Sequence, residues 1–302
     1  MKHAIGIDLG GTFVKFALVS ENGDSLFYDK LPIKAGTKRD DIINVIHEAV
    51  RTSLKKAENE SALVTGIGIG TPGVVNNGIV LGGADNLDGW QNVNLREIYS
   101  ETYKLPVFVD NDANVMGLAE VAYGAAKDCS DVVFLTVGTG IGGAIVVGGK
   151  LYGGYVNRGG ELGHIVVEHN GIDCSCGGKG CLEAYASTSA LISKYKALTG
   201  LQVDGYHIVE KYHEGKTAAI AVMHEHAEYL GHGVASFINI FAPQKVVIGG
   251  GISEAGQFYI DLIAKAAFKY AMPDCSVNTQ IVAAVLGNRA GCLGASSLVL
   301  TR

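Results

Sequence analysis

Two glycine clusters, each placed between two β-rich runs, restrict this sequence more than any other feature. The first is Gly10-Gly11, between runs at residues 3–8 and 13–20, and the second spans 138–143, between runs at 131–137 and 144–147. Each pair of runs is followed by a hairpin-type turn, at 21–24 and 148–150. This repeated order predicts two related lobes, with a cleft between them for a substrate.

The rest of the chain is typical of an α/β protein. We expect further strands at 25–33, 63–71, 106–109 and 245–248, and helices at 38–57, 113–123, 217–241, 254–270 and 290–300.

Composition excludes several classes of function. Lys and Arg number 24 against 30 Asp and Glu, for a net charge of −6, and no basic run exists, so we expect no nucleic-acid partner. Asp8 interrupts what would be the apolar part of a secretion signal, and no apolar run reaches membrane-spanning length, so we expect a cytoplasmic protein with no membrane partner. In a reducing compartment, clustered cysteines indicate metal binding or simple burial.

The first glycine turn has the chemistry of an anion site. Gly10 and Gly11 leave backbone N–H groups open to a phosphate, Thr12 adds a hydroxyl donor, and Asp8 is suited to order a water on Mg²⁺. An acid beside two glycines also occurs in plain hairpin turns. The recurrence of the pattern at 138–143 favours phosphate binding.

Two other nucleotide motifs fit less well. Gly138, Gly140 and Gly143 match the GxGxxG fingerprint of dinucleotide folds, but a short strand follows them where that fold needs a helix N-terminus. A P-loop is absent, because Glu210 stands where Gly215-Lys216-Thr217 would need its leading glycine.

At this point a family resemblance becomes specific. DLGGT at 8–12, GTGIGG at 138–143 and IGGG at 248–251 resemble the two phosphate segments and the adenosine segment of the actin-like ATPase superfamily. Residues 159–183 resemble the signature of the ROK family of sugar kinases and sugar-responsive repressors. The resemblance runs from about residue 4 to residue 300 and implies two ribonuclease-H-like α/β lobes hinged around ATP, and a homodimer.

We expect a small lobe of residues 1–117 and 290–302 and a large lobe of residues 118–289. The implied nucleotide contacts of the large lobe are Gly138, Thr139, Gly140, Gly142, Gly249, Gly250 and Gly251.

Asp112 lies where a predicted strand ends and a helix begins. By pattern alone it could equally cap that helix. Phosphoryl transfer to an alcohol, however, needs a carboxylate to accept the hydroxyl proton, and the resemblance implies that Asp112 is this base. It also implies sugar contacts from Gly73, Asn86, Asn111, Glu161, His164 and Glu183. Residues 71–73 and 86–90 resemble the family's loops over the sugar, and Trp90, at the end of the second, could equally be a core anchor.

Cys174, Cys176 and Cys181 are spaced more tightly than most zinc thiolates, so the spacing alone leaves buried thiols as an alternative. The resemblance implies Zn²⁺ with His164 as the fourth ligand, and His169 is a rival by proximity. Four protein ligands leave no position for water, so we expect a structural metal that orients His164 toward the sugar. Loss of the metal should then weaken sugar binding and change ATP binding far less.

These features together predict an ATP-dependent hexose kinase using Mg²⁺ and Zn²⁺, with glucose as the first choice. Kinases for N-acetylmannosamine, N-acetylglucosamine, allose or fructose share nearly the same residues. A sugar-sensing regulator is the alternative from another class. We expect a kinase because such repressors carry an N-terminal helix-turn-helix, for which the residues before Asp8 leave no room. An oxidoreductase would rest on the GxGxxG match alone.

Overall fold

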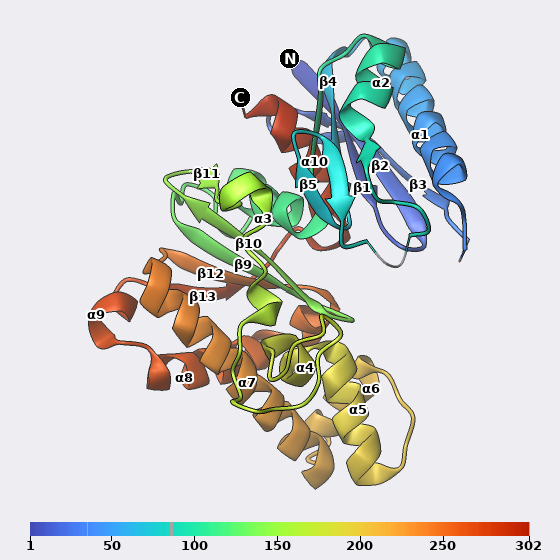
Figure 1. Ribbon diagram of the computed structural model, residues 1–302. Helices are drawn as coiled ribbons and strands as arrows, with labels where there is room; N and C mark the ends of the chain where they lie inside the picture. Colours follow the sequence, from blue (N-terminus) through green and yellow to red (C-terminus); the bar gives the residue numbers. More distant parts are fainter. Residues whose placement is uncertain (35, 85–86, 302) are drawn as a thin grey trace. The chain divides into compact units, whose positions relative to one another are not determined.

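The computed structural model describes residues 1–34, 36–84 and 87–301, which form two compact α/β units (Figure 1). Unit 1 comprises Met1–Asp128, Leu151–Gly159 and Asn288–Arg302, and unit 2 comprises Cys129–Lys150 and Gly160–Gly287. The expected boundary between residues 117 and 118 falls inside helix α3 (Asp112–Tyr123).

Unit 1 is built on a five-stranded sheet in the order β3-β2-β1-β4-β8. Its first three strands pair antiparallel, and β4 and β8 continue the sheet in parallel. Two predicted strands have the bounds of β2 and β4. The strands are β1 (Lys2–Leu9), β2 (Phe13–Ser20), β3 (Ser25–Pro32), β4 (Leu63–Thr71) and β8 (Val107–Asn111).

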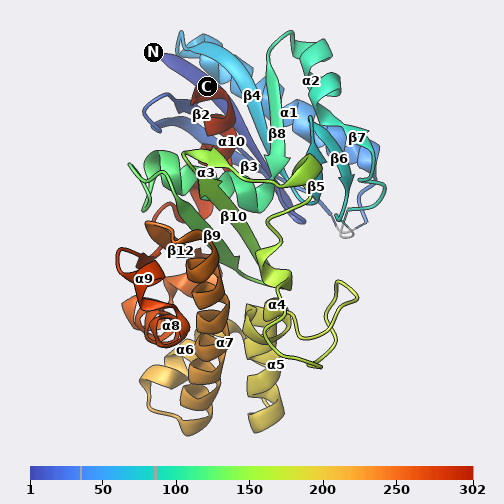
Figure 2. The same ribbon diagram turned by 60° about the vertical axis from the view of Figure 1, so that its left-hand side comes forward.

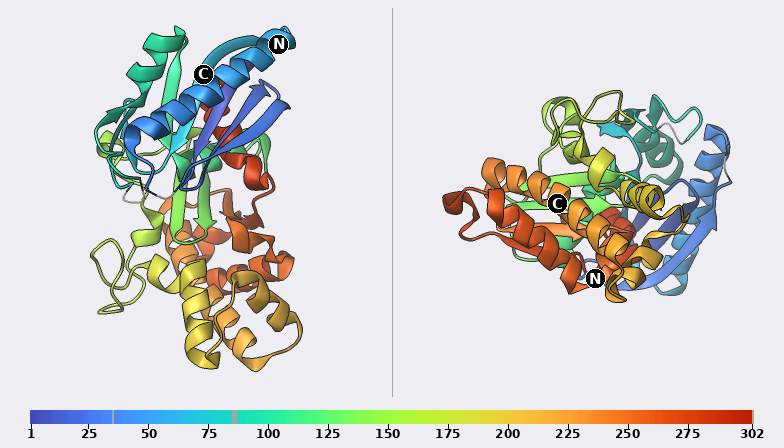
Figure 3. Two further views of the ribbon diagram at one scale, coloured as in Figure 1. Left: turned by 90° about the vertical axis from the view of Figure 1, so that its right-hand side faces the viewer. Right: turned by 90° about the horizontal axis from the view of Figure 1, so that it is seen from below.

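Successive side chains of β1 and β4 point to opposite faces of this sheet, and a different helix packs on each face. Ile5, Ile7 and Leu9 belong to the core that includes the buried face of α1 (Arg39–Asn59), which lies across one face in Figure 3. On the other face, glycines of the sheet have no side chains, so α10 (Ala290–Leu300) packs directly against the strand backbone. A Cβ at Gly68 would stand 1.7 Å from the carbonyl oxygen of Ala295, so any side chain there would push α10 away.

Smaller elements complete unit 1. A three-stranded sheet and helix α2, none of which the sequence pattern predicted, lie between β4 and β8 in the chain. Their bounds are β5 (Val74–Asn76), β6 (Ile79–Gly82), β7 (Val93–Asn94) and α2 (Leu95–Tyr103), and the 3₁₀ turns are η1 (Tyr155–Asn157) and η4 (Gly287–Arg289).

Unit 2 repeats this topology in a second sheet, with the order β11-β10-β9-β12-β13. Antiparallel β9 and β10 form the hairpin that the repeated glycine pattern predicted. Parallel β12 and β13 continue the sheet, and β13 was not predicted from the sequence. The strands are β9 (Val132–Val137), β10 (Ile141–Val147), β11 (Lys150–Leu151), β12 (Lys245–Gly249) and β13 (Gln280–Ala283).

The second glycine turn is shorter than the sequence indicated. Gly142 and Gly143 lie in β10, paired with Thr136 and Leu135. Backbone pairing needs no side chain, so these glycines continue the ladder, and the missing side chain of Gly143 leaves room for Leu162, whose Cδ1 would stand 2.6 Å from a Cβ there. Only residues 138–140 connect the strands.

The helices of unit 2 pack around α7 (Thr217–Phe241), whose predicted bounds agree with the structure. Figure 2 shows α8 beside it. The predicted start of α8 at 254 was wrong, because Gly256, at φ +109°, separates it from the 3₁₀ turn η3. No described helix is long and apolar enough to cross a membrane. The remaining bounds are η2 (Leu162–His164), α4 (Leu182–Ala186), α5 (Thr188–Thr199), α6 (Gly205–His213), η3 (Gly251–Ala255), α8 (Gln257–Tyr270) and α9 (Pro273–Ser276).

Candidate functional site

The first glycine turn, in unit 1, surrounds a buried carboxylate. Asp8 is 4% exposed near the end of β1, and its Oδ2 lies 3.5 Å from Nζ of Lys15, its partner on β2. Burial raises the pKa of Asp8, and the neighbouring ammonium opposes that effect. The turn closes by a 2.9 Å bond from Gly10 N–H to the carbonyl of Phe13, while Gly11 and Thr12 are exposed. The N–H of Gly10, expected to be open, is thus paired within the turn, and exposed Gly11 and Thr12 remain as candidate phosphate donors after the acid Asp8.

Asp112 is the first residue of α3, also in unit 1. Asn111 caps this helix, since its Oδ1 accepts from the N–H groups of Ala113 and Asn114 at 2.9 and 3.3 Å. Asp112 also accepts from Ala113 N–H, at 2.9 Å. Burial is the main cause that raises the pKa of Asp112, and the charge of Asp8 raises it further. The cap is thus supplied by Asn111, and the sequence places beside it a carboxyl with increased affinity for a proton.

The expected sugar loops of unit 1 are partly described. The side-chain amide of Asn111 donates to the carbonyl of Gly73 at 3.0 Å, which ties β8 to the segment after β4. Trp90 is 2% exposed and donates its indole N–H to Thr71 at 2.9 Å, so it is a core anchor. Asn86 lies outside the described residues.

Three hydrogen bonds fix the second glycine turn, in unit 2. Inside it, Gly138 N–H donates to the carbonyl of Gly140 at 2.9 Å. The carbonyl of Gly138 accepts from Thr188 N–H at the start of α5, at 2.8 Å. Ile141 N–H donates to Oε2 of Glu183 at 2.8 Å. A short turn without bulky side chains is therefore fixed relative to α4 and α5.

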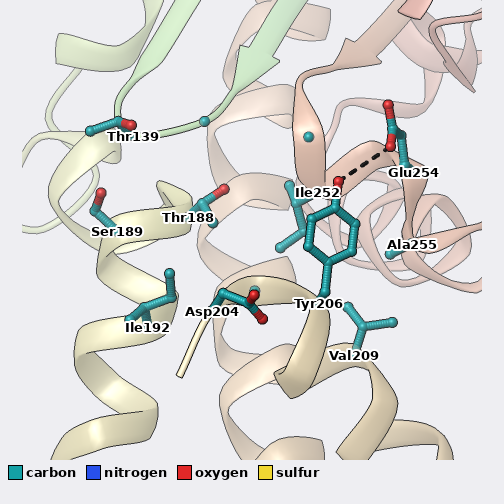
Figure 4. Close-up of a pocket in the computed structure, with 13 residues that line it drawn as sticks. Thr139, Thr188, Ser189, Ile192, Asp204, Tyr206, Val209, Ile252, Glu254 and Ala255 are labelled. Carbon is teal, nitrogen blue, oxygen red and sulfur yellow. Dashed lines mark hydrogen bonds between the residues drawn. The ribbon is translucent and has the colours of Figure 1, made fainter. Parts of the chain in front are cut away.

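A cavity of about 420 Å³ opens beside this turn (Figure 4). It has apolar walls with a few polar groups at its rim, a combination and size suited to a purine and its ribose. Tyr206 and Glu254 approach each other across one side, with 3.4 Å between the hydroxyl and Oε2. The lining residues are Gly138, Thr139, Thr188, Ser189, Ile192, Asp204, Gly205, Tyr206, Val209, Gly251, Ile252, Glu254 and Ala255.

Three of the predicted nucleotide residues, Gly138, Thr139 and Gly251, line this cavity. Gly249 and Gly250 instead lie against β9. A Cβ at Gly250 would stand 2.2 Å from the carbonyl oxygen of Val137, so this glycine brings strand β12 close to its neighbour. Sequence reasoning missed the walls from α5 and α6. Asp204, which caps α6 by accepting from His207 N–H at 2.9 Å, gives a helix-start signal but nothing specific to a nucleotide.

The four predicted metal ligands come together in unit 2. The ligand atoms of His164, Cys174, Cys176 and Cys181 all lie within 4.8 Å of one another. Nδ1 of His164 is 3.7 Å from the sulfur of Cys174, and the sulfurs of Cys176 and Cys181 are also 3.7 Å apart.

This donor set fits a zinc ion. Zn–S bonds of about 2.3 Å in a tetrahedron put neighbouring sulfurs about 3.8 Å apart, close to the spacing found here. Burial raises the pKa of Cys181 to about 12, so its thiol keeps its proton until a cation displaces it. His169, the rival ligand, is not part of the cluster formed by the described residues.

Comparisons with known proteins agree with this architecture. The profile of the ROK family matches residues 4–302, and the chain belongs to this family. It is 37% identical to a glucokinase of Thermotoga maritima over 99% of this chain and 97% of the relative. It is 33% identical to a xylose repressor of Caldicellulosiruptor bescii over 98% of this chain and 78% of the relative. A ROK family glucokinase from Streptomyces griseus, solved with glucose and AMPPNP, superposes with a TM-score of 0.83 at 32% identity, covering 99% of this chain and 100% of that one. The predicted family and the two-lobe actin-like fold class are thereby confirmed.

Proposed function

We propose that this protein is an ATP-dependent hexose kinase with glucose as its preferred acceptor. The observation that carries the proposal is Asp112, a carboxyl with a raised pKa at the junction of β8 and α3, fixed beside the Asn111 cap. A regulator that only senses a sugar has no need for a proton acceptor there. Similarity to glucokinases, one of them bound to glucose and AMPPNP, supports the same reaction.

In the proposed reaction Asp112 takes the proton of the sugar hydroxyl as its oxygen bonds to the γ-phosphorus. The bond to the β-phosphate oxygen breaks, and ADP leaves with the electron pair. The adenosine occupies the cavity beside α5 and α6, and Gly11, Thr12 and Thr139, the exposed residues of the two glycine turns, supply phosphate donors. Mg²⁺, held through Asp8, would neutralise the charge on the phosphates.

Glu161, His164 and Glu183 are the proposed acceptors for sugar hydroxyls, with Asn111, Gly73 and Asn86 from unit 1. Zn²⁺ on the Cys₃His cluster would fix the tautomer of His164, because Nδ1 faces the sulfurs and leaves Nε2 for the sugar. N-acetylmannosamine, N-acetylglucosamine, allose and fructose remain alternative acceptors. The proposed homodimer can be checked by sedimentation.

A hexose panel with ATP consumption as the readout tests this proposal. We expect turnover with glucose, and Asp112→Asn should lower it by roughly 10²- to 10⁴-fold, the usual contribution of a positioned general base. Asp29→Asn, which alters an exposed carboxylate of the same unit, is the matched control and should leave turnover unchanged.

The similarity to xylose repressors favours a sugar-sensing regulator as the second candidate. Sugar binding without ATP consumption for any hexose, in both wild type and Asp112→Asn, would support the regulator and refute the kinase.

A further inference from the structure

The carboxylate of Glu183 connects two segments that are distant in the sequence. Its Oε2 accepts from Ile141 N–H at 2.8 Å, at the end of the turn that lines the nucleotide cavity. Its Oε1 accepts from the hydroxyl of Ser175 at 3.1 Å, between the metal ligands Cys174 and Cys176. One side chain therefore bridges the nucleotide turn, residues 138–141, and the cysteine loop, residues 173–181.

The residues that directly precede Glu183 in the chain hold it in place. Cys181 is followed directly by Leu182, which is fully buried and packs against Gly233 of α7 so closely that a Cβ there would stand 2.5 Å from the leucine Cδ2. Leu182 N–H also donates to the carbonyl of Ile165 at 2.9 Å. The carboxylate thus projects from a helix whose first residue is anchored and whose preceding residue is a metal ligand.

The other side of the bridge is equally close. A Cβ at Gly140 would stand 2.3 Å from Oε2 of Glu183, so only glycine lets the turn reach this carboxylate. At the opposite end, the turn is fixed by the bond from Thr188 N–H to Gly138. Gly138 and Thr139 lie between these two attachments and line the cavity. A shift of Glu183 must therefore reach the nucleotide site.

We propose that Glu183 is a positioning residue through which the metal-bound cysteine loop holds the nucleotide turn in its binding geometry. This inference rests on the proposed function, since it concerns the ATP site. It changes one expectation from the sequence, namely that the metal would matter to the sugar and hardly to ATP. A carboxylate oxygen accepts two hydrogen bonds, so a sugar contact from Glu183 is compatible with this role.

Ser175→Ala is the sharpest variant, because Ser175 is exposed and its substitution changes none of the proposed ligands and not Glu183. Its hydroxyl also lies 3.9 Å from the sulfur of Cys174, so zinc content must be measured beside affinity. Calorimetric titration with AMPPNP should give an affinity about 2- to 10-fold weaker than wild type, from the loss of one solvent-exposed hydrogen bond. Elemental analysis should still find one zinc per chain. Ser193→Ala, at an exposed serine on α5, is the matched control and should bind AMPPNP like wild type.

Chelation of the zinc completes a double-mutant cycle. It should weaken AMPPNP binding in wild type more than in Ser175→Ala, because the variant has already lost the connection. Hydrogen exchange of the Ile141 amide, a readout that needs no nucleotide, should be faster in Ser175→Ala and in Glu183→Gln than in wild type.

Equal AMPPNP affinity and equal Ile141 exchange in wild type and a folded Ser175→Ala would overturn the positioning role. A wild type that binds no AMPPNP would refute the proposed function. Ile141 exchange would still show whether Glu183 transmits the state of the cysteine loop.

Discussion

The two glycine turns occupy equivalent places in two sheets of the same topology, yet they are supported in different ways. In unit 1 the carboxylate belongs to the strand itself, since Asp8 pairs with Lys15 across the β1–β2 ladder. In unit 2 the equivalent pair is Thr136 and Gly142, and the carboxylate comes from Glu183, 42 residues beyond Ile141. The first turn depends on its own hairpin. The second depends on a helix and on the cysteine loop.

Removal of a proposed metal ligand should produce the largest effect, because it disturbs the support of the second turn and not that of the first. Cys176→Ser should lose the zinc and weaken hexose binding by roughly 5- to 150-fold, because His164 no longer meets the sugar in a fixed orientation and a desolvated polar pair is left unmet. AMPPNP binding should weaken by the smaller factor expected for Ser175→Ala. Titration of hexose and nucleotide separately, with circular dichroism as a check of folding, measures both.

The contrast would fail if Cys176→Ser, folded and free of zinc, kept the hexose affinity of wild type. Amide exchange at Gly10 serves as an internal reference, since its bond to the Phe13 carbonyl lies within the hairpin of unit 1. It should stay unchanged.

A methyl group added to each turn should have unequal effects on stability. A Cβ at Gly140 meets the Glu183 carboxylate at 2.3 Å, whereas a Cβ at Gly10 meets only the Phe13 carbonyl oxygen at 3.5 Å, an ordinary contact. Gly140→Ala should lower the free energy of unfolding by about 1–3 kcal/mol, or the melting midpoint by roughly 2–12 °C.

Gly10→Ala, measured without ligand by the same thermal melts, should shift the midpoint by less than about 2 °C. Equal losses in the two variants would mean that the two turns are supported alike.

The smallest expected effect is a pH dependence that belongs to unit 1. Because burial raises the pKa of Asp8 above its value in the unfolded chain, the native state holds more protons between those two values. Asp8 therefore contributes most to the free energy of unfolding below the unfolded pKa of 3.8. This contribution declines as the pH rises through the pKa of the folded state.

Asp8→Asn should remove this part of the pH dependence. Melting midpoints of wild type and variant, recorded from acid to neutral pH, should differ in slope through that window, with the wild type losing more stability as the pH rises. Parallel curves would show that Lys15 cancels the effect of burial.

Much of the fold was predictable because it is encoded locally. Apolar runs with β-branched residues determined β2 and β4 with their exact bounds, and helical periodicity determined α7. The repeat of glycine turns predicted two related lobes, each with a strand–turn–strand hairpin. Three cysteines within eight residues indicated metal binding or simple burial, and the family resemblance implied a zinc site with His164 as the fourth ligand.

Other features depend on neighbours that no local pattern identifies. Leu162 packs beside Gly143 of β10, and the walls of the proposed nucleotide cavity come from α5 and α6, whose helical signals carry no ligand chemistry. The bridge from Ser175 through Glu183 to Ile141 exists only once α4 is anchored by Leu182 against α7. The sequence by itself determined most strands of the two main sheets, the places of the glycine turns and the grouping of three cysteines, since these depend on the order of residues along the chain. The tertiary structure decided which carboxylate supports which turn, because a hydrogen bond depends on a distance in space between residues that the chain separates.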